Sequence, residues 1–234
     1  MKRLLFGALL VAALPSVAGD LPSLSALSQD QFRRLSEDLG AALSYKGVTP
    51  ATPLGLTGFD VGVEVSVTDM KHSDLFALAG NNSTDYIAVP KVHFYKGLPW
   101  GIDLGAFVGT ASNLDASIFG ADMRYALLDD ALSTPAVSLR VSGTRTSDIG
   151  SLRVSTMAAD LMVSKRLTLF TPYAGAGVVR TSSRGSGAGL NEETFDKSRI
   201  FAGLNVNLAV MNLAVEAEKL GDNTTLAAKV GWRF

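Results

Sequence analysis

Apolar and polar residues alternate with a period of two through most of the chain. Between Gly58 and Thr68, Val61, Val63, Val65 and Val67 alternate with polar or small residues, and the pattern recurs as far as the C-terminus. A period of two is typical of β-strands whose two faces meet different surroundings. The pattern predicts ten strands, at 58–68, 84–95, 100–112, 115–127, 134–146, 152–164, 168–181, 197–210, 212–220 and 223–234.

Strand length and the placement of aromatic residues indicate which face is apolar. A secreted lipocalin-like barrel would also alternate, with its apolar row turned inward. Most of the predicted strands are longer than ordinary soluble strands and long enough for a tilted bilayer crossing of about 9–11 residues. Large aromatic residues also gather at one end of the expected sheet, as in the interface girdle of a membrane barrel. These residues are Phe59, Phe94, Trp100, Tyr125, Phe170, Trp232 and Phe234. We therefore expect the apolar rows to face lipid.

The connections between the strands support the same fold. The two longest, 69–83 and 182–196, fall at one end, while 96–99, 128–133, 165–167 and the Met211-Asn212 corner fall at the other. Long external loops and short periplasmic turns are usual in outer-membrane barrels. The predicted fold class is all-β, an antiparallel up-and-down transmembrane β-barrel of about ten strands, with eight or twelve as alternatives. Pro90 implies a bulge or a later start in the second strand, because proline cannot donate a ladder hydrogen bond.

The N-terminus has the pattern of a secretory signal peptide. Lys2 and Arg3 precede an apolar run from Leu4 to Leu14, and the small-residue triplet at 16–18 follows. The run is too short for a membrane helix, so we expect cleavage after Ala18. The chain has no cysteine, which excludes disulfides and a lipid attachment site at the cleavage point.

Residues 19–57 form a different kind of segment. Ser28 and Gln31 have the spacing of a capping box, and Phe32, Leu35 and Leu39 have helical spacing. They predict a short amphipathic helix that begins near Gln29 and ends at Gly40 or as late as Ser44. Two placements are open: the helix packs at the periplasmic mouth or membrane interface, which we favour, or it plugs the lumen. The predicted organisation is thus a signal peptide (1–18), a helix and linker (19–57) and a barrel (58–234).

The last strand carries a resemblance to a known family. Leu226, Ala228, Val230, Trp232 and Phe234 alternate with smaller or polar residues, and the chain ends on the phenylalanine. This resembles the insertion signal of Gram-negative outer-membrane β-barrel proteins, with Val230, Trp232 and Phe234 as its residues. The resemblance implies an outer-membrane location, contact with outer-membrane lipid and lipopolysaccharide, and recognition by the barrel-assembly machinery. It does not identify a subfamily.

If the apolar rows face lipid, the alternating positions fill the lumen with charges of both signs. Those we expect there are Asp60, Glu64, Lys91, His93, Asp103, Asp122, Arg124, Arg140, Asp160, Arg199, Glu216, Glu218, Lys229 and Arg233. Near-balance favours a salt-bridged filling over an ion-selective channel lined by one sign. We expect His93 to face Asp103, and Arg124 and Arg140 to lie within reach of Asp122, with Asp160 one strand further on.

The sequence leaves several functions open. The favoured hypothesis is a structural or surface-binding protein, with the loop from Thr181 to Asp196 as a flexible contact region. The alternative is a narrow, porin-like channel for a small or apolar solute, gated by the N-terminal helix. An outer-membrane hydrolase is the least favoured, because His72 with Asp69 and Asp74 offers only half of a protease-like arrangement. With 21 basic and 22 acidic residues, the chain has no excess positive charge for nucleic acid. No metal or cofactor motif appears, so we expect no cofactor.

Overall fold

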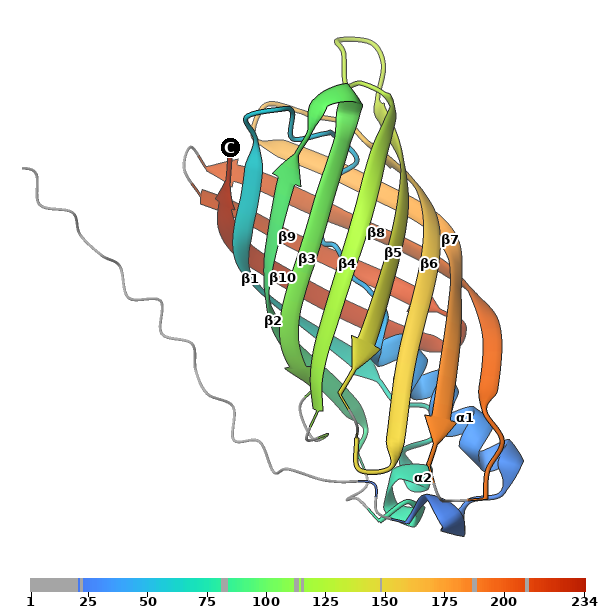
Figure 1. The fold of residues 1–234 in the computed structure, drawn as a ribbon. Helices are drawn as coiled ribbons and strands as arrows, with labels where there is room; N and C mark the ends of the chain where they lie inside the picture. The colour runs from blue at the N-terminus through green and yellow to red at the C-terminus, as the bar shows by residue number, and fades with distance from the viewer. Residues whose placement is uncertain are drawn as a thin grey trace, which may run out of the picture.

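The chain folds into a closed barrel of ten antiparallel strands (Figure 1). The computed structural model describes residues 21, 23–80, 84–111, 114, 116–147, 149–186, 189–208 and 211–234. Each strand pairs with the next along the chain, and β1 closes the barrel against β10. The predicted fold class is therefore confirmed. The predicted signal peptide lies outside the described residues.

The strands are close to those expected from the alternation. Their bounds are β1 Phe59–Asp69, β2 Tyr86–Gly97, β3 Ile102–Ala111, β4 Ala116–Leu128, β5 Ala136–Thr146, β6 Leu152–Ser164, β7 Phe170–Gly185, β8 Glu193–Leu208, β9 Met211–Leu220 and β10 Asn223–Arg233. One end holds Phe59 and Phe234, whose backbones pair and whose rings lie 4.9 Å apart. We call it the C-terminal end. The opposite end holds the connection 70–85 with the short helix α2 (Ser73–Leu78), and we call it the loop end.

Three local expectations were wrong. The segment from Thr181 to Asp196 is mostly strand, because β7 and β8 continue as a paired ladder beyond the apolar positions. Pro90 causes neither a bulge nor a late start: β2 runs through it, and Pro90 pairs with Val65 of β1. The β2–β3 ladder begins one residue later, at Lys91, so the missing N–H group lies beyond that ladder. Met211 and Asn212 belong to β9 and do not form a corner.

The alternation separates the two faces of the wall. In β1 the odd-numbered valines are partly or largely exposed on the outer face, whereas Asp60, Glu64 and Ser66 are buried inside. All seven aromatic residues of the expected girdle are exposed, at the C-terminal end. No described helix is long and apolar enough to span a bilayer.

Inward-facing aromatic rings lie over glycines of neighbouring strands. Tyr95 pairs with Gly105, Phe107 with Gly120, Tyr173 with Gly203, and Phe201 with Gly175. A Cβ atom added at any of these glycines would lie 2.0–2.3 Å from its nearest neighbour, which in three of the four is an atom of the paired ring. At Gly105 the Asp122 carboxylate is slightly closer than the Tyr95 ring. Each glycine therefore leaves room for a large side chain that would otherwise not fit in the narrow lumen.

The N-terminal segment runs through the inside of the barrel. A single turn, η1 (Leu24–Ala26), leads into α1 (Gln29–Leu43), which begins with the predicted capping box of Ser28 and Gln31. The side chain of Gln29 bonds to Asn191 and Glu193 beside β8 at the loop end, while Leu54 already bonds to Asp103 at the C-terminal end. Residues 29–54 therefore pass along the lumen from one end to the other, with α1 nearer the loop end. The favoured placement of the helix, at the periplasmic mouth or the membrane interface, was wrong, because α1 lies inside the barrel.

Candidate functional site

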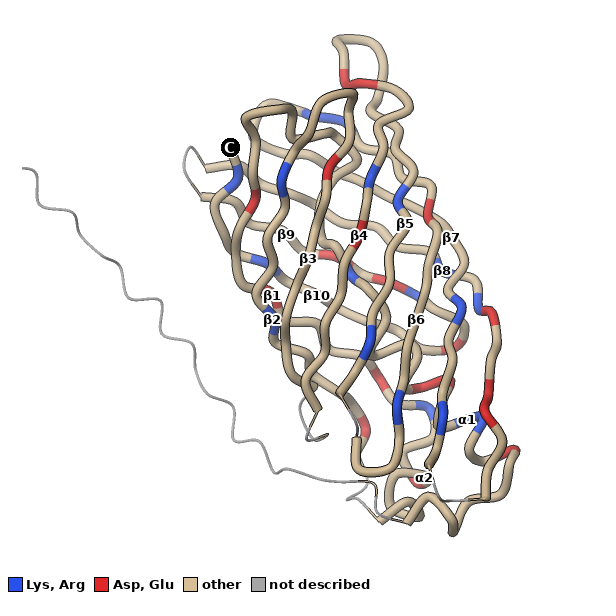
Figure 2. The backbone as a smooth tube through the Cα atoms, in the orientation of Figure 1, with Lys and Arg blue, Asp and Glu red and all other residues tan. Residues whose placement is uncertain are grey.

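Charged residues occur along the strands and not only in the connections (Figure 2). Thirteen of the fourteen charged residues expected in the lumen are buried, and Arg233 is partly buried. They concentrate in the half of the lumen nearer the C-terminal end, where residues 44–54 pass between them. Their contacts with this segment decide whether the lumen is open.

Asp60 is the centre of a cluster at the C-terminal end. Lys229 Nζ lies 2.9 Å from Asp60 Oδ2, His93 Nε2 lies 3.1 Å from Oδ1, and Arg233 Nη1 lies 3.5 Å from Oδ2. The expected pairing of His93 with Asp103 was wrong. The β2–β3 register places Phe107 opposite His93, while β1 brings Asp60 to its other side.

Arg124 binds the wall and the N-terminal segment together. Its Nη2 lies 2.6 Å from Asp103 Oδ2, and its Nη1 donates to the Pro50 carbonyl at 2.6 Å and to the Thr49 hydroxyl. Asp103 in turn accepts a hydrogen bond from the Leu54 amide at 3.1 Å. This ion pair therefore holds residues 49–54 at the C-terminal end of the lumen.

Asp160 lies between two buried arginines. Arg140 Nε donates to Asp160 Oδ2 at 3.0 Å, and Arg199 Nε donates to Oδ1 at 2.9 Å. The Nη1 group of Arg199 donates to the carbonyl of Tyr45 at 2.7 Å. One carboxylate thus organises two guanidinium groups, and one of these also holds the N-terminal segment.

Asp122 has a different partner from the one expected. Neither Arg124 nor Arg140 forms an ion pair with it; instead Tyr45 donates its hydroxyl proton to Asp122 Oδ1 at 2.6 Å. The Tyr95 hydroxyl lies 2.7 Å from that of Tyr45. The expectation failed because the N-terminal segment was not assigned to the lumen, and Tyr45 comes from that segment.

Lys46 is a second lumen residue that the sequence reasoning missed. Its Nζ donates to the Ala41 carbonyl at 2.6 Å and lies 3.4 Å from Glu218 Oε1. Lys91 donates to the Lys46 carbonyl at 3.1 Å and pairs with Glu64 at 2.8 Å. The expected wall residues comprise seven acids and six fully basic residues, so Lys46 supplies a compensating positive charge. Glu216 is buried, and its Oε2 atom has no hydrogen-bond partner.

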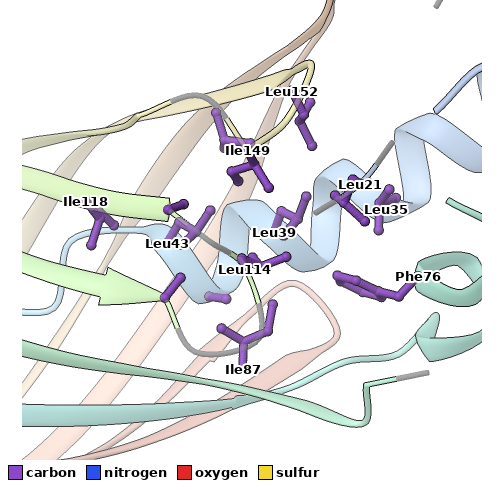
Figure 3. Close-up of a cluster of buried hydrophobic side chains, with 14 of the residues drawn as sticks. Leu21, Leu35, Leu39, Leu43, Phe76, Ile87, Leu114, Ile118, Ile149 and Leu152 are labelled. Atoms are coloured by element: carbon purple, nitrogen blue, oxygen red, sulfur yellow. The ribbon is translucent and has the colours of Figure 1, made fainter. Parts of the chain in front are cut away.

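The half of the lumen nearer the loop end is apolar. The helix α1 presents Leu35, Leu39 and Leu43 to a ring of side chains that project from the wall and the loops (Figure 3). These include Phe76, Ile87, Leu114, Ile118, Ile149 and Leu152. Gly40 lets the helix approach β7, since a Cβ atom there would lie 2.5 Å from Thr181 Oγ1. This end is therefore closed by hydrophobic packing.

A polar contact fixes α1 to the rim. Asp38, which is fully buried, accepts hydrogen bonds from the His72 amide at 2.8 Å and from Asn223 Nδ2 at 2.9 Å. His72 Nδ1 lies 3.5 Å from Asp38 Oδ1, whereas Asp69 pairs with Lys71 and caps the Thr224 amide. His72 is thus engaged with the helix and not with Asp69 or Asp74 in a protease-like arrangement.

Some of the lumen residues that were not predicted had a signal in the sequence. Tyr95, Phe107 and Phe201 lie at positions with the same parity as the lumen charges of their strands, so strict alternation turns them inward. Tyr173 lies on β7, where none of the expected lumen charges marks the inward row. Tyr45 and Lys46 had no such signal, because they lie beyond a helix in an irregular segment. Only the placement of that segment reveals them.

Comparison with known proteins finds distant similarity to solved structures. No protein-family profile and no curated protein matches the chain. Among solved structures it is similar to the N-terminal β-barrel domain of Pseudomonas aeruginosa OprF, with 13% identity, a TM-score of 0.40, and coverage of 77% of this chain and 99% of that one. It is also similar to the translocator domain of the autotransporter NalP from Neisseria meningitidis, with 15% identity, a TM-score of 0.42 and coverage of 91% and 98%. For the outer membrane protein OprG from Pseudomonas aeruginosa the identity is 11%, the TM-score is 0.36 and the coverage is 80% and 99%.

OprF and OprG are outer-membrane β-barrel proteins. The outer-membrane location stays a prediction from the sequence. These matches do not establish a subfamily.

Proposed function

We propose that this protein is a non-conducting outer-membrane barrel whose lumen is permanently occupied by its own N-terminal segment, and that it acts through its external surface. The observation that carries the proposal is the double attachment of this segment. Its helix is held by apolar packing, and residues 45–54 are held by Arg124, Arg199, Asp103 and Asp122. Removing such a segment would take the hydroxyl donor from Asp122 and the carbonyl acceptors from Arg124 and Arg199, and each hydrogen bond lost by a buried charged group costs about 1.5–3 kcal/mol.

The same contacts weigh against a pore that opens readily. An open channel would need water in place of the Tyr45 hydroxyl and the Pro50 carbonyl, and it would need α1 to leave its apolar ring. Apolar surface buried around a helix contributes about 25 cal/mol per Å², so exposing it is costly. These contacts support our proposal that the loop end is a stable surface that acts by binding or by structural support.

A disulfide lock tests the proposal against the gated channel. The chain has no cysteine, and the Thr52 and Ser164 hydroxyl oxygens lie 3.2 Å apart, so Thr52→Cys with Ser164→Cys should bridge the segment to β6. In planar bilayers we expect the wild type and the oxidised double variant to be equally silent. A variant without residues 19–57 should show steady conductance steps. If the wild type conducts and the oxidised double variant does not, the gated channel replaces this proposal. This comparison holds even if the deletion variant does not fold.

Cysteine labelling tests the direction of the barrel. Ser25 is exposed beside α1 at the loop end, and Ser133 is exposed in the turn between β4 and β5 at the C-terminal end. In intact cells, a membrane-impermeant maleimide should label Ser25→Cys and leave Ser133→Cys unlabelled until the cells are lysed. The reverse pattern would place the loop end in the periplasm and refute an external function for it.

A further inference from the structure

The beginning of β8 forms an open strand edge at the loop end. The β7–β8 ladder already includes Glu193, whereas the β8–β9 ladder begins only at Arg199. Because β9 ends at Leu220, no described strand lies beside residues 193–198 on the side away from β7. We call residues 194–198 the β8 edge. This part of β8 lies at the margin of the barrel, beside α1 (Figure 1).

The backbone groups of the β8 edge point away from β7. The Ser198 carbonyl accepts a hydrogen bond from the Gly221 amide at 3.1 Å, so Ser198 directs its backbone groups to the β9 side. Since successive residues of a strand direct these groups to opposite sides, Thr194 and Asp196 face the same way as Ser198. The edge thus offers the N–H groups of all three residues and the carbonyl groups of Thr194 and Asp196. None of these groups bonds to a described residue, and all three residues are exposed.

The β8 edge is held rigidly from its other sides. Arg180 of β7 binds the Asp196 carboxylate through two hydrogen bonds of 2.8 Å. On the inner face, Lys197 Nζ lies 3.0 Å from the Glu37 carboxylate of α1. The β7–β8 ladder runs through this region without a register shift. The edge is therefore already extended, so a partner strand would lose little free energy in ordering it.

The β8 edge lacks the usual protection of an exposed strand. Natural edges are blunted by proline, by bulges or by charged side chains that obstruct pairing. Residues 194–198 contain no proline and no bulge, and Lys197 is engaged with Glu37. The outward row of β8 is polar as far as Ser198 and becomes apolar from Ile200. The edge therefore lies beyond the apolar belt, where unpaired backbone groups are accessible from water.

We propose that the β8 edge binds an extended segment of another protein, which adds a strand to the wall above the β9–β10 turn. The free groups recur every second residue, about 6.6 Å apart, and alternate between donors and acceptors. Another extended backbone matches this order of groups, whereas a phosphate, a sugar or a lipid headgroup does not. At a rise of about 3.3 Å per residue, the edge accommodates a segment of about five residues. This role rests on the proposed function, which places the loop end outside the cell.

A synthetic strand peptide tests the β8 edge in the whole chain, refolded in detergent micelles. The probe is a capped Thr-Val-Thr-Val-Thr-Val peptide that is N-methylated at alternate positions, so that it keeps one pairing edge and cannot stack on itself. Amide hydrogen exchange is followed by NMR. Without peptide, we expect fast exchange at Thr194, Asp196 and Ser198 and slow exchange at Phe195 and Lys197, which face β7. The peptide should slow exchange at the first three amides at least tenfold and leave the other two unchanged.

Proline variants separate backbone pairing from side-chain contacts. Asp196→Pro removes the central N–H group of the edge and no bond of the β7–β8 ladder, so β8 should tolerate it. We expect this variant to weaken peptide binding at least tenfold. Asp196→Asn is the matched control, because it loses the same charge and keeps the N–H group, and its Kd should stay within twofold of the wild type. If Asp196→Pro does not show the heat-modifiable migration of a folded barrel, Thr194→Pro and its control Thr194→Ser make the same comparison.

Four results would overturn the proposal. The first is equal binding by the proline variants and the wild type. The second is equal binding of a peptide N-methylated at every position, which has the same side chains and no N–H group on either edge. Slow exchange at the edge amides without peptide, with dimers in sedimentation, would indicate a second copy as the occupant. A protein that is silent in bilayers and labelled at Ser25→Cys from outside, but does not bind the peptide, would keep the proposed function and lose only the strand partner.

Discussion

The two halves of the lumen are closed by different physical means. Toward the loop end, α1 lies in an apolar ring with Leu39 fully buried, as a helix packs in the core of a soluble protein. Toward the C-terminal end, an irregular segment is held by buried ion pairs and by carbonyl groups that accept from arginines. Contacts in the apolar half depend little on orientation, because the hydrophobic effect is not directional. In the polar half every buried charge needs a partner. The first half therefore supplies affinity for the segment, and the second fixes its path.

This difference suggests how the chain assembles. A helix can enter an apolar ring in several rotations at modest cost, but Tyr45, Thr49 and Pro50 each meet one particular group on the wall. Because α1 and the residues that follow it together cross the whole lumen, the barrel has to close around the segment or admit it from one end. Contacts of the polar half thus select one arrangement among those that the apolar half permits.

The largest expected effect comes from the polar half. Asp160→Asn should leave Arg140 and Arg199 without their shared carboxylate and should lower the free energy of unfolding by about 3–5 kcal/mol. Urea titration in lipid vesicles, followed by Trp fluorescence, measures the change. Asp196→Asn is the matched control, because it breaks an exposed arginine pair and should leave the free energy of unfolding nearly unchanged. Equal losses in the free energy of unfolding for the two variants would mean that water solvates Asp160 in the lumen.

The apolar half should respond to the loss of volume. Leu39→Ala removes buried methyl groups from the centre of the ring and should lower the free energy of unfolding by about 2–5 kcal/mol. It should also increase trypsin cleavage after Arg33 and Arg34, which lie on the same helix. Leu132→Ala, at an exposed turn, should change neither measurement. Unchanged cleavage in Leu39→Ala would contradict the view that this ring holds the helix.

How far the sequence predicts the molecule follows the same division. Alternation predicted the ten strands and turned Asp160 and Arg199 inward, because a period of two is a local property of each strand. It did not predict the partners of those residues, since pairing depends on register and on what lies in the lumen. His93 contacts Asp60 of β1 and not the expected Asp103. Asp122 accepts a hydrogen bond from Tyr45 and not from the expected arginines. The capping box predicted where α1 begins, but nothing local to it indicated that the helix lies inside the barrel.

A smaller effect should come from the hydroxyl that joins the segment to the wall. Tyr45→Phe removes the proton donor to Asp122 and leaves that buried carboxylate without its hydrogen bond, so we expect a loss of about 1–3 kcal/mol. The apolar half should keep its packing, because the ring of residue 45 remains. Tyr125→Phe, on the exposed girdle, should be neutral in the same urea titration. A loss as large as that for Asp160→Asn would mean that the hydroxyl organises the ion pairs as well.

The smallest effect should come from the helix end at the mouth of the barrel. The Ser28 hydroxyl accepts a hydrogen bond from the Gln31 amide at 3.3 Å, and the Gln31 side chain accepts one from the Ser28 amide at 2.9 Å. Ser28→Ala removes the first of these bonds, and such caps contribute about 1 kcal/mol. Because Ser28 is exposed and Phe32 lies one turn further into the apolar ring, the loss should be local. Amide hydrogen exchange should become faster in the first turn of α1, while amides of the β1–β10 ladder keep their protection.

Ser133→Ala, in an exposed turn, should leave both regions unchanged. Faster exchange throughout the barrel in Ser28→Ala would show that the helix cap and the wall open together, and the two halves of the lumen would then be one cooperative unit.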